Sequence, residues 1–225
     1  MAWLIFQYRP TALFSLKTSR ATSTVGKTLL VPTPYAVKMA FLEVGMRTGR
    51  LPDPDEFVRL LAGTLVRIGV PDDACVTGTI QKIRQEPKKA TAEQPYIANV
   101  ALREIVHFRG VFALAFQEPE QPGILMDLAP AINYFGKRGS FMQYEGFEER
   151  AVLDAGFTKG LLEEGDQPSR CHLATLDDFG PEANFDALNS FSETPMKRNR
   201  HRGWLETVVP LGVHNLGPGF VHYRK

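Results

Sequence analysis

Cysteine is scarce in this chain, with only Cys75 and Cys171 among 225 residues. Two cysteines so far apart form neither a disulfide framework nor a metal-binding spacing, so we expect a reducing, intracellular compartment. Long apolar runs are also lacking, because no stretch reaches the ~18 residues that a membrane-spanning helix needs. Arg9 and Pro10 interrupt the first apolar stretch, which is not the pattern of a signal peptide. The sequence therefore predicts a cytoplasmic protein without a membrane partner.

An excess of either charge is absent as well, since 26 Lys and Arg stand against 25 Asp and Glu. The whole chain therefore lacks the strongly basic balance that is typical of many nucleic-acid-binding proteins. The charges are nevertheless segregated along the sequence, which predicts one positive face and one negative face. Basic residues concentrate in segments 1–52, 81–90 and 197–202, and acidic residues in segments 118–127, 145–166 and 177–186.

What the chain does have is a distinctive helix start, in Leu-Val-Pro-Thr-Pro-Tyr-Ala-Val-Lys-Met-Ala-Phe-Leu at residues 30–42. Thr33 is suited to cap a helix, and Pro34 fits its first turn, where a missing N–H costs nothing. Tyr35 and Lys38 lie off the apolar stripe of that helix. The sequence thus places an aromatic ring and an ammonium beside a helix N-terminus, which favours phosphate binding. An ordinary amphipathic helix with a solvated lysine is the alternative from the local pattern.

The predicted elements through residue 145 follow the order β, α, an extra helix, β, β, α, β. This order is typical of a ferredoxin-like (RRM-like) unit, a recurrent scaffold for RNA recognition. We predict an α+β fold with a ferredoxin-like domain at 1–145 and an irregular, β-containing elaboration at 146–225. The expected helices are 34–47, one opening at 53–56, and 124–135 bent at Pro130; the expected strands are 3–14 broken near Pro10, 76–83, 97–108, 110–117, 140–144, 208–213 and 219–223, with an exposed loop or hairpin tip at 85–95.

Two segments taken together resemble the Cas-five family, whose members are RAMP-superfamily subunits of type I CRISPR surveillance complexes (Cascade). They are Leu29–Leu42 and Ala131–Gln143, the latter reading Ala-Ile-Asn-Tyr-Phe-Gly-Lys-Arg-Gly-Ser-Phe-Met-Gln. Val209-Pro210-Leu211-Gly212 adds to the likeness, which covers residues 1–145 well and the C-terminal third poorly.

The resemblance implies a RAMP domain with a protruding β-hairpin, the thumb, around residues 78–100. It implies a non-catalytic subunit in antiviral defence that grips the 5′ handle of the guide RNA (crRNA) and caps the backbone filament. The expected protein partners are the neighbouring backbone RAMP subunit and the large subunit, with target DNA contacted indirectly. No cofactor is expected. If the chain does not bind RNA, the alternative is a generic ferredoxin-like protein-interaction module.

Single-stranded RNA is recognised through phosphate contacts and base stacking, so cations and rings in the matching segments are the candidate site. Lys137 and Arg138 lie between two glycines that allow close approach of a ligand to the backbone. Phe141 is expected in the core, as is one of Tyr134 and Phe135. The basic run 197–202 before Trp204 is suited to bind RNA or target DNA, or is a connector. The candidate RNA-binding residues are Lys17, Arg20, Lys27, Tyr35, Lys38, Lys82, Arg84, Lys88, Lys89, Tyr134, Lys137 and Arg138.

One branch of the family cleaves precursor crRNA without metal, using tyrosine, lysine and histidine. Tyr35, His107 and Lys137 have the matching chemistry, which makes a metal-independent endoribonuclease the alternative function. Strand alternation instead favours His107 as a half-buried strand residue. No histidine lies at metal-ligand spacing from another histidine or a cysteine, so no metal site is expected.

Overall fold

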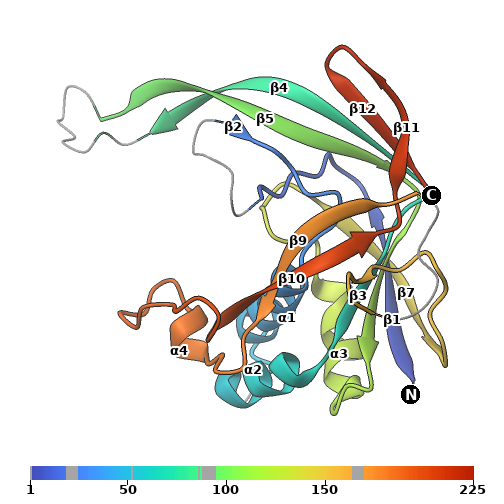
Figure 1. The fold of residues 1–225 in the computed structure, drawn as a ribbon. Helices are drawn as coiled ribbons and strands as arrows, with labels where there is room; N and C mark the ends of the chain where they lie inside the picture. Colours follow the sequence, from blue (N-terminus) through green and yellow to red (C-terminus); the bar gives the residue numbers. More distant parts are fainter. Residues whose placement is uncertain (1, 19–24, 52, 86, 88–94, 164–169) are drawn as a thin grey trace.

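The computed structural model describes residues 2–18, 25–51, 53–85, 87, 95–163 and 170–225. Its body is a four-stranded antiparallel sheet with the order β3-β6-β1-β7, covered on one face by helices (Figure 1). The strands are β1 (Trp3–Pro10), β3 (Val66–Gly69), β6 (Phe112–Gln117) and β7 (Met142–Arg150), and the helices are α1 (Pro34–Arg47), α2 (Pro54–Gly63) and α3 (Pro122–Leu128). The protein is thus α+β, as predicted.

A long hairpin extends from this body between β3 and β6 (Figure 1). Its strands are β4 (Asp73–Gln85) and β5 (Ile97–Arg109), which pair without a register shift from Asp73 opposite Arg109 to Gln85 opposite Ile97. They belong to a five-stranded sheet of order β11-β12-β4-β5-β2, completed by β2 (Val25–Gly26), β11 (Gly212–Gly217) and β12 (Phe220–Arg224). The strands predicted on either side of residues 85–95 are confirmed.

Residues 146–225 are more regular than the sequence indicated. β9 (His172–Phe179) pairs with β10 (Arg202–Val209), and β8 (Lys159–Gly160) completes this three-stranded sheet; α4 (Phe185–Leu188) follows β9. The strand predicted at 208–213 is wrong, because the chain turns at Pro210 and Leu211 and passes from one sheet to another. The boundary predicted at residue 145 falls inside β7, and the division into two parts stays a prediction.

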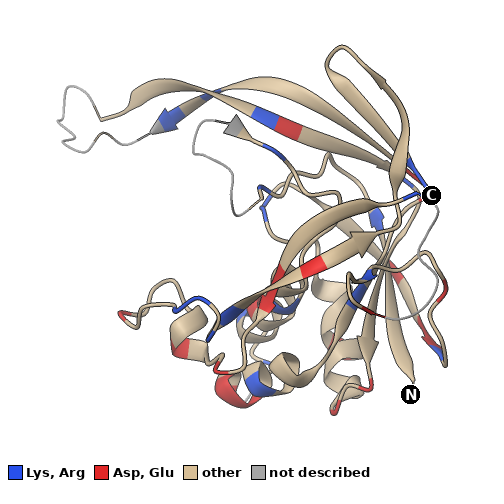
Figure 2. Ribbon diagram, in the orientation of Figure 1, with Lys and Arg blue, Asp and Glu red and all other residues tan. Residues whose placement is uncertain are grey.

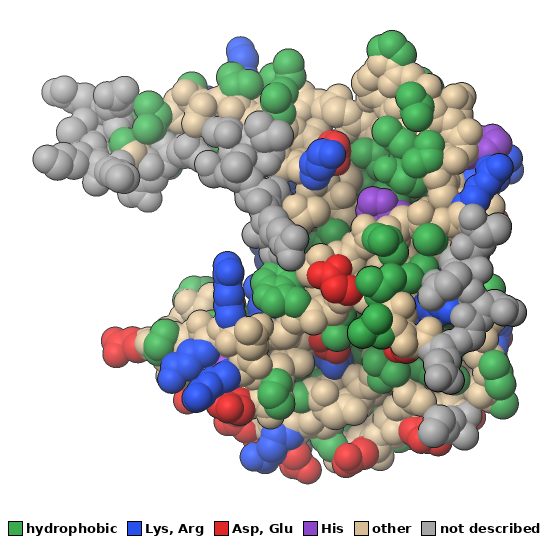
Figure 3. All heavy atoms as spheres, viewed as in Figure 1, with side chains coloured by type: hydrophobic (Ala, Val, Ile, Leu, Met, Phe, Trp, Pro, Cys, Tyr) green, Lys and Arg blue, Asp and Glu red, His purple; other side chains and the backbone are tan. Residues whose placement is uncertain are grey.

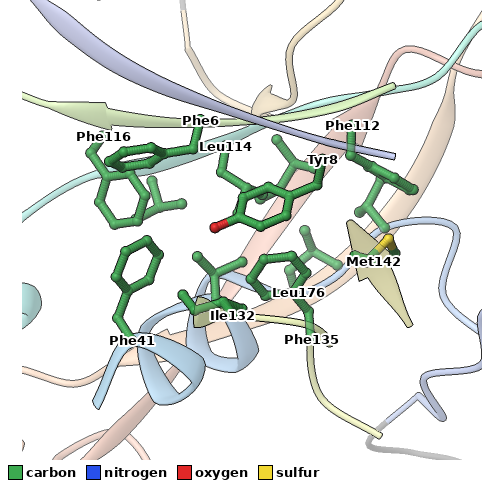
Figure 4. Packing of buried hydrophobic residues seen from close by; sticks show 14 of the residues in the cluster. Phe6, Tyr8, Phe41, Phe112, Leu114, Phe116, Ile132, Phe135, Met142 and Leu176 are labelled. Atoms are coloured by element: carbon green, nitrogen blue, oxygen red, sulfur yellow. The ribbon is translucent and has the colours of Figure 1, made fainter. Parts of the chain in front are cut away.

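One hydrophobic core joins the early and late segments of the chain (Figure 4). Phe41 of α1 packs between Phe6 and Phe116, with ring centroids 5.7 and 5.1 Å away. Leu176 of β9, which is 1% exposed, enters the same core. Burial of such side chains is worth about 1.5–3 kcal/mol each, so the late strands are held against the body by the core itself.

Local signals explain the helix boundaries. The cap at Thr33 is confirmed, since its side-chain oxygen accepts a hydrogen bond from the Ala36 N–H at 3.1 Å. The helix predicted at 124–135 ends earlier, at Leu128, and a 3-10 turn follows at Ala129–Ala131. Pro130 explains the difference, because it has no N–H to continue the α-helical hydrogen bonds. None of the helices described is long and apolar enough to cross a membrane.

Candidate nucleic-acid interface

A cleft of about 650 Å³ lies at the N-terminus of α1. Seven separate parts of the chain line it: residues 15–17, Leu29, residues 33–43 at and within α1, Arg103 of β5, the turn 134–137, and the paired strands β9 and β10. The molecular surface is deeply hollowed between the hairpin and the part that carries α1, β9 and β10 (Figure 3). The cleft is therefore assembled from segments that are distant in sequence.

The start of α1 forms one wall, because Thr33, Tyr35 and Ala36 all line the cleft. The Thr33 cap satisfies the Ala36 N–H, and Val37 N–H donates to the Thr33 carbonyl at 3.0 Å. The Tyr35 ring is half-buried and meets the Phe179 ring edge-on, at 5.4 Å between centroids. The prediction that an aromatic ring lies at this helix N-terminus is thus confirmed.

A cation stacks on that ring. The Arg202 guanidinium lies 4.2 Å from the Tyr35 centroid and 5.8 Å from the Trp204 centroid, and it is ion-paired with Asp177. Arg202 and Trp204 are two residues apart on β10, so both side chains lie on the face of the strand that lines the cleft. The result is a layered wall of aromatic and guanidinium planes, which is a suitable surface for nucleobases.

The Gly-Lys-Arg-Gly turn lines the cleft next to the start of α1. Gly136 has φ +76°, and a Cβ there would lie 2.7 Å from Leu16 Cδ1, so both conformation and space require glycine. Tyr134, Gly136 and Lys137 line the cleft, whereas Arg138 is exposed beside it. Phe135 is buried at 1%, so Tyr134 is the ring left to the cleft. The prediction that Phe141 is buried is wrong, because it is 44% exposed.

Lys38 is buried in this structure and does not line the cleft. Its side chain is 0% exposed, and its Nζ lies 2.8 Å from Oδ1 of Asp178 on β9. It also lies 5.6 Å from the Phe179 ring centroid. Burial lowers the pKa of Lys38 and raises that of Asp178, while their mutual attraction opposes both shifts. The lysine anchors α1 to β9. This corrects the expectation that its ammonium is presented to RNA beside the helix N-terminus.

The basic loop before α1 lies partly at the cleft. Lys17 is exposed, lines the cleft and forms an isolated β-bridge with Thr28. Lys27 is exposed and lines two smaller pockets instead. Arg20 lies outside the described residues. The structure therefore brings Lys17, but not Lys27, to the same cleft as Lys137.

The described candidate cations of the hairpin do not line the cleft. Lys82 and Arg84 are exposed on β4, opposite Val100 and Ala98 of β5. They share a face with Ile80, which is 71% exposed. Lys88 and Lys89 lie outside the described residues. Lys and Arg are visible along the hairpin and where β10 begins, while acids gather towards α2 and α4 (Figure 2).

The catalytic alternative is not assembled at the cleft. Tyr35 and Lys137 line it, but His107 does not: it is exposed on β5, opposite Cys75. The expectation of a half-buried His107 is also wrong. Burial raises the pKa of Tyr35, which keeps the phenol protonated at neutral pH. The sequence did not assign Arg202 and Trp204 to this cleft, and it gave no role to Arg103. The i, i+2 spacing of Arg202 and Trp204 was the one sequence feature that could have indicated a shared strand face.

Comparison with known proteins finds no matching family model and no matching curated protein. Several solved structures are similar to this chain, and two of them are as follows. One, described as a CRISPR protein from Archaeoglobus fulgidus, is 9% identical, with a TM-score of 0.49 over 100% of this chain and 92% of that one. The other, described as a CRISPR RNA-guided surveillance complex, is 15% identical, with a TM-score of 0.47 over 92% of this chain and 89% of that one.

Proposed function

We propose that this chain is a non-catalytic guide-RNA-binding subunit of a type I CRISPR surveillance complex, and that the cleft grips the 5′ handle of the crRNA. One observation carries the proposal. The two segments that resemble the Cas-five family, Leu29–Leu42 and Ala131–Gln143, meet at the same cleft although 88 residues separate them. Tyr35 comes from the first segment, and Tyr134 and Lys137 come from the second.

The chemistry of the cleft supports a single-stranded ligand. Lys17 and Lys137 are exposed cations that line it, and Tyr35 and Trp204 line it as well. Unpaired RNA binds through such combinations of phosphate-neutralising cations and stacking rings. A double helix would leave these rings without an exposed base to stack on.

The fold supports the wider assignment. We infer that the sheet order β7-β1-β6-β3, with α1 and α3 as crossover helices, is ferredoxin-like, and that β4 and β5 form the thumb. The exposed Lys82 and Arg84 on the hairpin then contact the guide near its spacer, or the backbone RAMP subunit. The remaining partners of the proposal are the large subunit and, indirectly, target DNA.

The proposal is tested by fluorescence anisotropy with a labelled CRISPR repeat RNA over a series of salt concentrations. Each phosphate contact on a single strand contributes about 0.7 to the slope of log K against log salt. We expect Lys17→Ala with Lys137→Ala to weaken binding and to lower the slope by about 1.4.

The matched control is Arg59→Ala with Arg109→Ala, which removes two exposed cations that do not line the cleft. We expect the control variant to keep affinity and slope close to wild type. Equal losses in both double variants would show that net charge, and not the cleft, binds RNA.

A further inference from the structure

A second, smaller pocket of about 320 Å³ lies beside the cleft, between the base of the hairpin sheet and β9. Leu29 and Thr175 line both spaces, so the pocket adjoins the cleft. Its own lining combines Lys27, Glu104 and His172 with Tyr223 of β12. The predictions from the sequence assigned no role to Glu104 or Tyr223.

The lining combines two aromatic rings with a carboxylate and a cation. The His172 and Tyr223 rings meet edge-on, with centroids 5.8 Å apart and planes at 75°. Glu104 is held in place because its Oε2 accepts a hydrogen bond from the Thr28 N–H at 3.0 Å. Burial and the nearby Lys27 lower the pKa of His172, which leaves the imidazole neutral at pH 7. Lys27 is exposed and supplies a cation at the pocket.

We propose that this pocket takes one unstacked nucleobase of the RNA strand that the cleft holds, with guanine favoured. The inference rests on the proposed function and adds to it a specificity-determining site. At about 320 Å³ the pocket lies at the lower end of small-molecule sites, about 300–1,000 Å³, and suits a single base. Turning out a base costs least when it is already single-stranded.

The carboxylate of Glu104 determines the preference. Guanine presents two adjacent N–H donors, N1–H and N2–H, which one carboxylate accepts together. Uracil flanks its single N–H with two carbonyl oxygens, which a carboxylate repels. The His172 and Tyr223 rings supply stacking that any base can use, and Lys27 neutralises the phosphate that follows.

The first test is an abasic scan of the labelled repeat RNA, in which one base at a time is removed. For the wild-type chain we expect one position, a guanine, whose removal weakens binding about tenfold or more. Ala174→Leu fills the pocket with a larger side chain and should remove that position's effect. Glu104→Gln keeps the shape of the side chain and should reduce the advantage of guanine over uracil at that position.

The matched control is Glu206→Gln, which neutralises an exposed carboxylate that bonds to Thr175 but does not line the pocket. The control should reproduce the wild-type scan. The Glu104→Gln variant decides the test if Ala174→Leu does not fold. RNA binding in which no position depends on Glu104 or Ala174 would overturn the base pocket and leave the proposed function intact.

The second test does not need RNA binding. Guanosine 5′-monophosphate and uridine 5′-monophosphate are titrated into the free chain while the ring protons of His172 are followed by NMR. Guanosine monophosphate should shift them in the wild type and less in Glu104→Gln. A shift without any binding of repeat RNA would support the pocket and contradict the proposed function. No shift, together with a flat abasic scan, would reject the pocket.

Discussion

Removing Lys38 should destabilise the fold, and the structure allows the cost to be worked out. The Lys38 side chain is 0% exposed and that of Asp178 is 14% exposed, with 2.8 Å between Nζ and Oδ1. Breaking a buried pair by deleting one partner typically costs 3–5 kcal/mol, because the other charge stays buried. Asp178 would still accept the Phe179 N–H at 2.7 Å, and Arg67 still attracts it. We therefore expect Lys38→Met to cost about 3 kcal/mol.

Urea unfolding followed by circular dichroism measures this cost. With a slope of about 2 kcal/mol per M, a loss of about 3 kcal/mol lowers the midpoint by about 1.5 M. Lys38→Met with Asp178→Asn should recover part of it, because no uncompensated charge then remains. The control on the same helix is Arg47→Met, whose exposed pair with Glu43 is worth only about 0.3–0.5 kcal/mol.

A loss below about 1 kcal/mol for Lys38→Met, or strictly additive effects in the double variant, would refute the buried pair. The account would also be contradicted by a Lys38→Met chain that is as stable as wild type but has lost RNA affinity. That result would return Lys38 to the binding site.

Three further outcomes are expected. Trp204→Ala should weaken repeat-RNA binding by about 1–3 kcal/mol in anisotropy, whereas Trp204→Phe should keep most of the affinity. Gly136→Ala should lower the free energy of unfolding by at least about 1–2 kcal/mol, since it places a side chain at φ +76° against Leu16; unchanged urea unfolding would count against the turn geometry. Burial raises the pKa of Tyr8, so above about pH 10 the unfolded state loses the proton first and stability falls. Tyr8→Phe should flatten that fall in unfolding curves recorded between about pH 9 and 11, and an unchanged slope would exclude Tyr8 as its source.

The parts predicted correctly from sequence are those that nearby residues decide. Thr33 and Pro34 define the start of α1, and both act within one helical turn. Asp53 caps α2 in the same way, since its side chain accepts from the N–H groups of Asp55 and Glu56. The hairpin strands were predictable because turn-forming residues separate two long β-prone runs.

The parts that failed depend on distant partners. Lys38 has the sequence pattern of a surface residue, but its partner Asp178 lies 140 positions away. The site has the same character: Arg202 and Trp204 join Tyr35 only because β10 pairs with β9, which packs on α1. No local pattern contains that information, so the sequence could not show that Arg202 and Trp204 lie at the cleft beside Tyr35.

The most direct test of the central claim is incubation of the purified chain with labelled repeat RNA in EDTA, analysed on a native and a denaturing gel. The account predicts a shifted band on the native gel, lost steeply as salt rises, and intact RNA on the denaturing gel. A discrete metal-independent cut would contradict the non-catalytic role, and the absence of a shift at low salt would contradict RNA binding by this chain.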